Sequence, residues 1–299
     1  MPVRKAFSFP IFAVIGLALV TESAVADELK RVSINGYELA YVEQGQGEPV
    51  VFVHGGLQDY RMWRAQLPKF ASRYRAIAYS RRNNYPNAVS PEGTPDGAAD
   101  VHGEDLAALA NALGFSKIRV VAHSSGAHAA LFFAAKHPDM IVSLAVNEPP
   151  ALGMLSGLPN RAEILKEFAG LGAAREALKA GDVQRGIPMF VDVVGGPGAY
   201  ERRSDADKKM NLDNVSSYQA DAIKLPRPIF TCEMAKAITA PTLLSDAERS
   251  PRLFHHVLDQ LEDCLPNRER VEIPTSSHTV TVDNPNAYEQ AVLAFFARH

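Results

Sequence analysis

The sequence predicts an α/β fold in which helices flank a mostly parallel sheet of eight strands and a further helical segment is inserted. Six short apolar runs, each bounded by turn residues, have the continuous hydrophobicity of strands that are buried on both faces. Helical patterns lie between most of these runs, and such alternation is typical of a parallel sheet. A hairpin near the N-terminus supplies the other two strands.

The N-terminal segment, residues 1–26, is expected to be a secretory signal peptide and not part of the fold. Arg4 and an adjacent lysine precede an apolar run at residues 7–20, and Ala24 and Ala26 form a small-x-small pattern that predicts cleavage after Ala26. The apolar run is shorter than the roughly 20 residues that span a bilayer as a helix, which favours cleavage over a retained anchor. We therefore expect a soluble mature protein that is periplasmic or secreted.

The elements of the mature chain follow in a regular order. Residues 31–43 alternate apolar and polar side chains around Asn35 and Gly36, the dipeptide that most strongly predicts a tight hairpin. The buried-strand patterns lie at residues 50–53, 76–79, 118–122, 141–146, 242–244 and 271–273. The clearest helical patterns lie at residues 98–113, 125–136, 251–261 and 285–298.

One stretch interrupts this alternation. Residues 150–225 contain a helical pattern at 161–180 and a Gly- and Pro-rich turn at 195–198, but no clear strand. We interpret them as a helical cap inserted into one large α/β domain, whose core consists of residues 27–149 and 226–299. A chain of this length can bury a sizeable core.

The charge of the chain argues against two classes of partner. The chain has 31 Lys and Arg against 34 Asp and Glu, a formal net charge of -3, and its basic residues form no long block. Nucleic acids and anionic membranes both need a concentrated basic field. We therefore expect no nucleic-acid partner, and no membrane contact after the signal peptide is removed.

The chain has 2 cysteines, Cys232 and Cys264. An exported protein meets an oxidising compartment, where a pair of thiols tends to close. We favour a disulfide between them, which stabilises a fold by a few kcal/mol. Two buried free thiols are the alternative, because the sequence does not show whether the two β-carbons face each other.

A candidate nucleophile lies between a strand pattern and a helical pattern. Ser124 follows the apolar run that ends at Ala122 and precedes a helix rich in Ala and Phe, which is the context of a nucleophile elbow. The tight turn needs small residues two positions before and after the serine, and these are Ala122 and Gly126. The turn presents the hydroxyl at the carboxyl edge of the sheet, where open α/β folds bind ligands.

With this elbow the chain resembles the α/β-hydrolase family, and the likeness extends over nearly the whole mature length. Residues 53–57, Val-His-Gly-Gly-Leu, look like the oxyanion loop of that family. The resemblance implies that the backbone N–H groups of Gly56 and Ser125 stabilise a developing oxyanion and that His54 is structural. One such donor is worth roughly 3 to 4 kcal/mol in the transition state. Alanine at position 122, where the family usually has glycine, is a mild departure.

The general base is expected near the C-terminus. His278 follows the strand pattern at 271–273 in a short loop and precedes the final helical pattern. Family members place the catalytic histidine in that loop, and the chain order of serine, acid and histidine is also the family's. A solvated loop histidine is the alternative.

The acid is harder to assign. Many family members carry an aspartate after the seventh strand, where this chain has Ser250. A triad without a buried carboxylate can lose about four orders of magnitude in rate. Glu148, at the carboxyl end of the sixth strand, is our candidate, and Asp246 and Glu248 are the alternatives. The arrangement resembles the haloalkane dehalogenases, which keep their acid after the sixth strand but use an aspartate nucleophile, so Ser124 excludes their reaction. It is still more similar to the resorcylic-acid lactone hydrolases, which pair serine with glutamate there.

Other polar residues are not expected to be catalytic. His123 is the variable position of the elbow, and His128 lies one helical turn after the serine, where core packing can satisfy it. The histidines at 255–256 point to different faces of one helix, and no Cys and His spacing suggests a zinc site. Trp63 and Met62, after the oxyanion loop, either line the pocket or pack in the core.

These residues predict a hydrolase that transfers an acyl group to water and needs no metal or organic cofactor. Ser124 is the expected nucleophile, His278 the base and Glu148 the acid that orients it. Apolar residues at 187–191 of the expected cap suggest a small or medium apolar ester or lactone as substrate. A carbon–carbon bond hydrolase with the same triad and a non-catalytic ligand-binding protein are the alternatives.

Overall fold

The computed structural model describes residues 28–89, 98–222 and 229–299. The expected signal peptide lies outside these residues. Within the part of the chain that is described, no helix combines the length and the apolar character that crossing a membrane requires.

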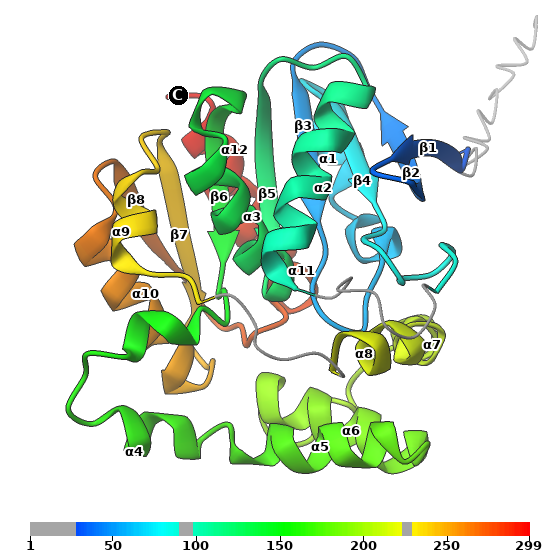
Figure 1. Cartoon of the computed structure of the whole chain (residues 1–299), viewed down its shortest axis with the longest axis vertical. Helices are drawn as coiled ribbons and strands as arrows, with labels where there is room; N and C mark the ends of the chain where they lie inside the picture. The colour runs from blue at the N-terminus through cyan, green and yellow to red at the C-terminus, as the bar shows by residue number, and fades with distance from the viewer. Residues whose placement is uncertain (1–27, 90–97, 223–228) are drawn as a thin grey trace, which may run out of the picture.

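An eight-stranded sheet forms the centre of the molecule (Figure 1). Across the sheet the strands are β1 (Lys30–Ile34), β2 (Tyr37–Gln44), β4 (Arg75–Tyr79), β3 (Pro49–Val53), β5 (Ile118–His123), β6 (Ile141–Asn147), β7 (Thr242–Ala247) and β8 (Arg268–Ile273). Strand β2 pairs antiparallel with β1 and β4, and the other neighbours are parallel. The sheet confirms the predicted fold class and contains every predicted strand.

The sheet has a hydrophobic core on each face, because successive residues of a strand point to opposite sides. In β3, Val51 and Val53 belong to the core on one face, and Val50 and Phe52 to the core on the other. The first core includes α2 (Ala99–Ala112), α3 (Ser125–Lys136) and α10 (Arg252–Cys264), and the second includes α1 (Leu67–Ala71) and α12 (Pro285–Phe296). Four short helices complete the connections: η1 (Tyr60–Trp63), η2 (Pro138–Met140), η3 (Leu152–Leu155) and α11 (Val280–Asp283).

Helices fill most of the chain between β6 and β7, where a cap is expected. They are α4 (Arg161–Lys166), α5 (Ala169–Lys179), α6 (Val183–Gly195), α7 (Asp205–Asp213) and α8 (Val215–Ala222), and they lie together at one end of the sheet (Figure 1). The single helical pattern at 161–180 is divided into α4 and α5. At this break, Phe168 packs edge-on against Phe254 of α10, with ring centroids 5.2 Å apart. This contact attaches the inserted helices to the layer beside the sheet.

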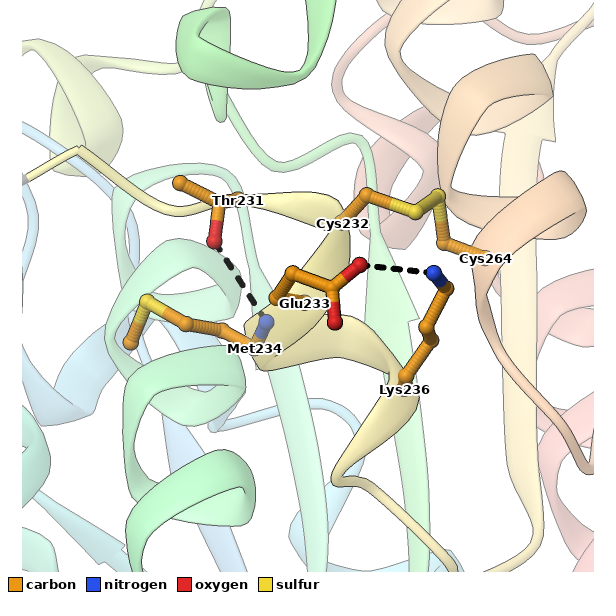
Figure 2. The surroundings of a disulfide bond; sticks show 6 residues. All are labelled: Thr231, Cys232, Glu233, Met234, Lys236 and Cys264. Carbon is orange, nitrogen blue, oxygen red and sulfur yellow. Dashed lines mark hydrogen bonds and ion pairs between the residues drawn. A yellow bond between two sulfur atoms is a disulfide. The ribbon is translucent and has the colours of Figure 1, made fainter.

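Cys232 and Cys264 form a disulfide, the pairing that the sequence favours (Figure 2). Cys232 begins α9 (Cys232–Lys236) and Cys264 ends α10, with their Cα atoms 5.4 Å apart. The side chain of Thr231 caps the first turn of α9 by accepting a hydrogen bond from Met234 N. The disulfide closes a loop with a sequence separation of 32. Closing a loop of this size stabilises the folded chain by about 3 to 4 kcal/mol in the chain-entropy account.

Candidate active site

Ser124 lies in a strained turn between β5 and α3. Its φ of 53° is in the left-handed region, which costs a residue other than glycine about 1 to 2 kcal/mol. Its N–H donates to Asn147 O at 2.8 Å. Gly126 leaves no room for a side chain, because a Cβ there would lie 2.3 Å from His54 O. The sharp turn and the close approach of the helix to the loop after β3 match the geometry expected of a nucleophile elbow.

The loop after β3 lies against this elbow. A Cβ built on Gly55 would meet His123 Cδ2 at 2.9 Å and Ser124 Cβ at 3.2 Å. A Cβ built on Gly56 would lie 3.8 Å from Ser125 Oγ. The structure therefore brings the residues of the two expected oxyanion donors, Gly56 and Ser125, close together next to Ser124.

Arg81 supports the oxyanion loop, a role that the sequence analysis missed. Its buried guanidinium donates from Nη2 to Gly55 O at 3.0 Å and to Ser125 Oγ at 3.1 Å. His54 is fully buried; its Nδ1 donates to Gly55 O at 2.8 Å and its Nε2 accepts from Arg81 N at 3.0 Å. No local pattern marks Arg81, because its partners come from distant parts of the chain.

Glu148 is the carboxylate that meets the candidate base. It follows β6 with a φ of 44° and is fully buried. Its Oε2 accepts from His278 Nδ1 at 2.5 Å and from Ser250 Oγ at 2.9 Å, and its Oε1 accepts from Ala247 N at 2.9 Å. Ser250 stands where many family members carry the acid, and here its hydroxyl bonds the glutamate of the neighbouring strand.

The ring of His278 contacts two aromatic rings. It stacks on Phe254, with ring centroids 4.2 Å apart and planes 7° from parallel, and its centroid lies 4.6 Å from that of His123. Since Nδ1 is bonded to Glu148, Nε2 is the atom that remains to accept a proton. Between these described residues, no hydrogen bond joins Ser124 Oγ to His278. Catalytic hydrogen bonds of this kind are often long before substrate binds and tighten in the complex.

The two alternative acids have other partners. Asp246 lies within β7, and its Oδ2 accepts from His255 Nδ1 at 2.8 Å and from Arg270 Nη2 at 2.7 Å. Glu248 accepts at 2.6 Å from a backbone N–H in the loop after β8. Neither carboxylate hydrogen-bonds His278 in the described part of the chain. The acid after β6 is the one that the structure brings to the base.

Burial changes the titration of the candidate acid and base. Burial raises the pKa of Glu148, and the hydrogen bonds from Ser250 and Ala247 oppose that shift. The pKa nevertheless rises to about 7, and a positive charge on the His278 imidazole would favour the ionised carboxylate. Burial and the nearby charge of Arg203 lower the pKa of His278. The imidazole is therefore neutral at physiological pH and able to accept a proton.

His123 and His128, which we did not expect to be catalytic, have structural partners, and Trp63, which we expected either to line the pocket or to pack in the core, lies in the core. His123 is buried, and its Nδ1 lies 2.8 Å from Asn147 Oδ1. His128 packs against Phe132, with ring centroids 5.2 Å apart. Trp63 is fully buried in the core. Packing and hydrogen bonding therefore account for these residues, which lie near the elbow and the oxyanion loop in sequence.

One group of side chains could offer metal ligands. Ligand atoms of Asp246, His255 and Glu272 lie within 4.8 Å of one another. Arg270 Nη2 lies 2.7 Å from Asp246 Oδ2 and already supplies a positive charge there. A divalent cation would have to compete with this guanidinium, so we assign no metal to the group.

The inserted helices reach the oxyanion loop. A Cβ on Gly56 would lie 3.4 Å from Phe190 Cζ of α6. The ring of Phe190 packs edge-on against Tyr218 of α8, with centroids 5.1 Å apart. Leu57 of the loop shares an apolar cluster with Val191 of α6. Apolar side chains from the insertion therefore lie against the loop that borders Ser124.

Comparison with known proteins finds a matching family model and several curated relatives. The sequence model of the family described as alpha/beta hydrolase fold matches residues 48–285. Epoxide hydrolase 4 of Mus musculus is 30% identical over 280 residues, which cover 89% of this chain and 78% of the relative. The soluble epoxide hydrolase of Corynebacterium sp. is 31% identical over 127 residues, which cover 42% of this chain and 41% of the relative. The chain spans between 30% and 41% of the length of the first curated relatives that it matches.

Solved structures share the fold over nearly the whole chain. A thermophilic esterase from Thermogutta terrifontis has a TM-score of 0.71 at 21% identity, with 91% of this chain and 98% of that chain covered. An epoxide hydrolase from Bacillus megaterium has a TM-score of 0.71 at 20% identity, with 90% of this chain and 100% of that chain covered. At such low identity these structures establish a common architecture, which hosts more than one reaction.

Proposed function

Since the chain belongs to the α/β-hydrolase fold family, we propose that it is a serine hydrolase that cleaves a carboxylic ester or a lactone through an acyl-enzyme intermediate. Ser124 is the nucleophile, His278 the general base, and Glu148 the acid that orients the imidazole and stabilises its cation. One observation carries the proposal. The strained serine after β5 stands at the same edge of the sheet as the buried histidine–glutamate pair, whose Nδ1 and Oε2 atoms are 2.5 Å apart.

The proposed cycle has two halves. His278 Nε2 accepts the proton of Ser124 Oγ as that oxygen attacks the carbonyl carbon of the substrate. The carbonyl oxygen becomes an anion and receives hydrogen bonds from the N–H groups of Gly56 and Ser125. The imidazolium then donates its proton to the leaving alcohol, and an acyl ester on the serine remains. Water, activated by the same imidazole, releases the acid and restores the hydroxyl.

Several relatives are named epoxide hydrolases. The identity of the nucleophile distinguishes ester hydrolysis from the opening of an epoxide. Attack of a serine hydroxyl on a carbonyl gives an ester, which water can hydrolyse in the second half of the cycle. Attack of the same hydroxyl on an epoxide carbon gives an ether, which has no carbonyl for water to attack. The enzyme would then be alkylated once and would not turn over. Ser124 therefore supports ester or lactone hydrolysis.

The position of the acid and the character of the insertion narrow the substrate. Glu148 follows the sixth strand, as in the resorcylic-acid lactone hydrolases that the chain resembles, so lactones are a close variant of the ester substrates. We propose that residues 150–225 act as a cap that selects the substrate. Phe190 and Val191 of this segment, beside Leu57, suit a substrate with an apolar portion.

The test is an assay of 4-nitrophenyl esters and a panel of lactones with the wild type, Ser124→Ala and Ser156→Ala. Ser156 is an exposed serine of the inserted segment and serves as the matched control. We expect Ser124→Ala to lose all measurable turnover and Ser156→Ala to retain the wild-type rate. Equal rates for the wild type and Ser124→Ala would instead indicate a binding protein, and turnover of styrene oxide by the wild type would contradict the acyl-enzyme route.

We further propose that the protein is exported to the periplasm or beyond, with residues 1–26 removed. The pairing of Cys232 and Cys264 is compatible with an oxidising compartment. Expression of the full chain, cell fractionation and the mass of the soluble product test this. A product that begins at Asp27 in the exported fraction is expected, whereas an intact N-terminus in the cytoplasm would contradict export.

A further inference from the structure

A cavity of about 90 Å³ lies beside the catalytic residues. Its wall includes Ser277 and Thr279, the two sequence neighbours of His278, and also His123, the residue before Ser124. Sequence neighbours of both the proposed nucleophile and the proposed base therefore line the cavity. The proposed chemistry does not use it.

The side chain of Arg203, which precedes α7 and belongs to this wall, is partly exposed and meets no anionic partner among the described residues. Its Nε is shielded from solvent and has no acceptor, and its guanidinium forms no ion pair with any residue that the structure describes. Burial lowers the pKa of Arg203, and the carboxylates of Asp207 and Asp283 oppose the shift from beyond contact distance. A cation held partly out of water without an anion costs folding free energy. A ligand that brings an anion to the guanidinium of Arg203 would explain why this side chain lies in the cavity wall.

The two aspartates of the wall already have donors of their own. Asp207 Oδ1 accepts from Arg64 Nη2 at 3.0 Å. Asp283 Oδ2 accepts from the N and Oγ of Ser277 at 2.8 and 2.6 Å. Three arginines and two aspartates line the cavity, so its wall carries a surplus of one positive charge. A monoanion would balance that surplus.

We infer that this cavity binds a carboxylate carried by the substrate, with Arg203 as its principal partner. The inference rests on the proposed hydrolysis and names its substrate class: an ester or lactone that bears one carboxylate a few bonds from the reacting carbonyl. A guanidinium binds a carboxylate through two parallel N–H···O hydrogen bonds. A phosphate dianion would bring two negative charges to a wall with a single positive surplus.

This site adds a polar end to the apolar substrate that the sequence suggests. The apolar portion would lie against Phe190 near the oxyanion loop. The carboxylate would enter the cavity that His123, the residue before Ser124, helps to line. The bound carboxylate would also neutralise Arg203, whose charge lowers the pKa of His278. Substrate binding would thereby strengthen the general base.

The experiment compares esters that match in size and differ by one carboxylate. Monomethyl glutarate against methyl pentanoate places the charge on the acyl side, and 4-acetoxybenzoate against 4-methylphenyl acetate places it on the alcohol side. The proteins are the wild type, Arg203→Gln, Arg203→Lys and the matched control Arg185→Gln, in which an exposed arginine of α6 is neutralised. Hydrolysis is followed by proton release at constant pH.

We expect the wild type to prefer one of the carboxylate-bearing esters. Arg203→Gln should lower kcat/KM for that ester by about 10- to 100-fold, the range typical of a lost hydrogen bond between charged groups. For the neutral ester, kcat/KM should change much less than for the carboxylate-bearing ester, because only the latter loses a charged hydrogen bond. Arg203→Lys should restore part of the preference, and Arg185→Gln should leave it unchanged. Equal loss on both members of a pair would overturn the inference.

A binding measurement keeps this result separate from the proposed function. Glutarate should raise the melting temperature of the wild type and of Ser124→Ala but not that of Arg203→Gln, and it should inhibit neutral-ester hydrolysis competitively. If glutarate binds through Arg203 while no ester is hydrolysed, the carboxylate site stands and the proposed function fails. If esters are hydrolysed and glutarate has no effect that depends on Arg203, the site fails alone. Inhibition or activation that is not competitive would assign the cavity to a free carboxylate and overturn its role in substrate binding.

The stability of Arg203→Gln is a further check. Because the substitution removes a partly buried charge that has no ion-pair partner among the described residues, the variant should melt at the wild-type temperature or above it. A melting temperature several degrees lower would show that the guanidinium supports the fold, and would contradict its assignment as a ligand-binding group.

Discussion

Two buried carboxylates at neighbouring strands, Glu148 after β6 and Asp246 in β7, each contact the Nδ1 of a histidine. The distances are 2.5 Å to His278 and 2.8 Å to His255. Burial raises the pKa of Glu148 and lowers that of its histidine, whereas the pKa of Asp246 is lowered and that of His255 is raised. A carboxylate and an imidazole therefore make a contact with a neutral imidazole in one place and an ion pair in the other.

The third partner of each carboxylate explains the difference. Burial would raise the pKa of Asp246, but hydrogen bonds from His255 and Arg270 outweigh it. Glu148 instead accepts from two neutral donors, a hydroxyl and a backbone N–H. No fixed cation neutralises it among the described residues, so in the proposed cycle it would be available to stabilise the imidazolium of His278. A buried carboxylate–histidine contact thus indicates a catalytic pair only where no fixed cation has already neutralised the acid.

The largest effect that tests this comparison is on turnover. Glu148→Gln should lower kcat by about four orders of magnitude, because the amide favours the wrong tautomer of His278 and cannot stabilise its cation. Asp246→Asn, the matched change in the neighbouring pair, should leave kcat within about threefold of the wild type. Steady-state assays on one activated ester measure both. A steep loss in Asp246→Asn with an active Glu148→Gln would reverse the assignment of the acid.

A smaller effect is expected from moving the acid. Ser250 Oγ lies 2.9 Å from Glu148 Oε2, at the position where many family members carry aspartate. In the double variant Glu148→Ala with Ser250→Asp, we expect kcat to recover by about 100-fold over Glu148→Ala, part of the factor that the buried acid contributes. Glu148→Ala with Ser250→Asn is the control, and it should show no recovery. Equal rates for the two double variants would mean that position 250 cannot serve the base.

The two pairs should also differ in their effects on stability. Asp246→Asn removes the charge that Arg270 and His255 share, and should lower the free energy of unfolding by about 2 to 3 kcal/mol, as for a partly buried ion pair. Glu148→Gln removes a buried carboxylate whose pKa is raised, and should leave that free energy nearly unchanged. Urea denaturation at pH 7 measures both. Comparable destabilisation by the two substitutions would contradict the distinction that we draw between them.

The smallest expected effect is on the pH dependence of kcat/KM. The reaction needs a neutral His278, so activity is lost as the pH falls through the pKa of its imidazole. Burial and Arg203 lower that pKa, so activity on a neutral ester should persist below pH 6.5, the ordinary value for histidine. Arg203→Gln should move the acidic limb to higher pH, because a positive charge near the imidazole is removed. An unchanged acidic limb in Arg203→Gln would show that the charge of Arg203 does not affect the pKa of His278.

Much of the fold and part of the site followed from local sequence patterns. Asn35 and Gly36 have φ values of 46° and 73° and turn the predicted hairpin, because few other residues adopt left-handed conformations at low cost. The elbow at Ser124 was recognisable for a similar reason: its tight turn demands small neighbours at fixed spacing. The division of the helical pattern at 161–180 was not predictable, because it accompanies a contact with Phe254 from a distant helix.

The sequence by itself determined the order of strands and helices, the turn that presents Ser124 and the loop that carries His278, since each depends on residues within a few positions of one another. Only the tertiary structure decided which carboxylate meets the base and which arginines surround the site. Glu148, Asp246 and Glu248 all lie at or near strand ends on one edge of the sheet, where spacing along the chain does not rank them. Their roles depend on neighbours contributed by other strands and by the insertion, and those neighbours are set by packing across the whole fold.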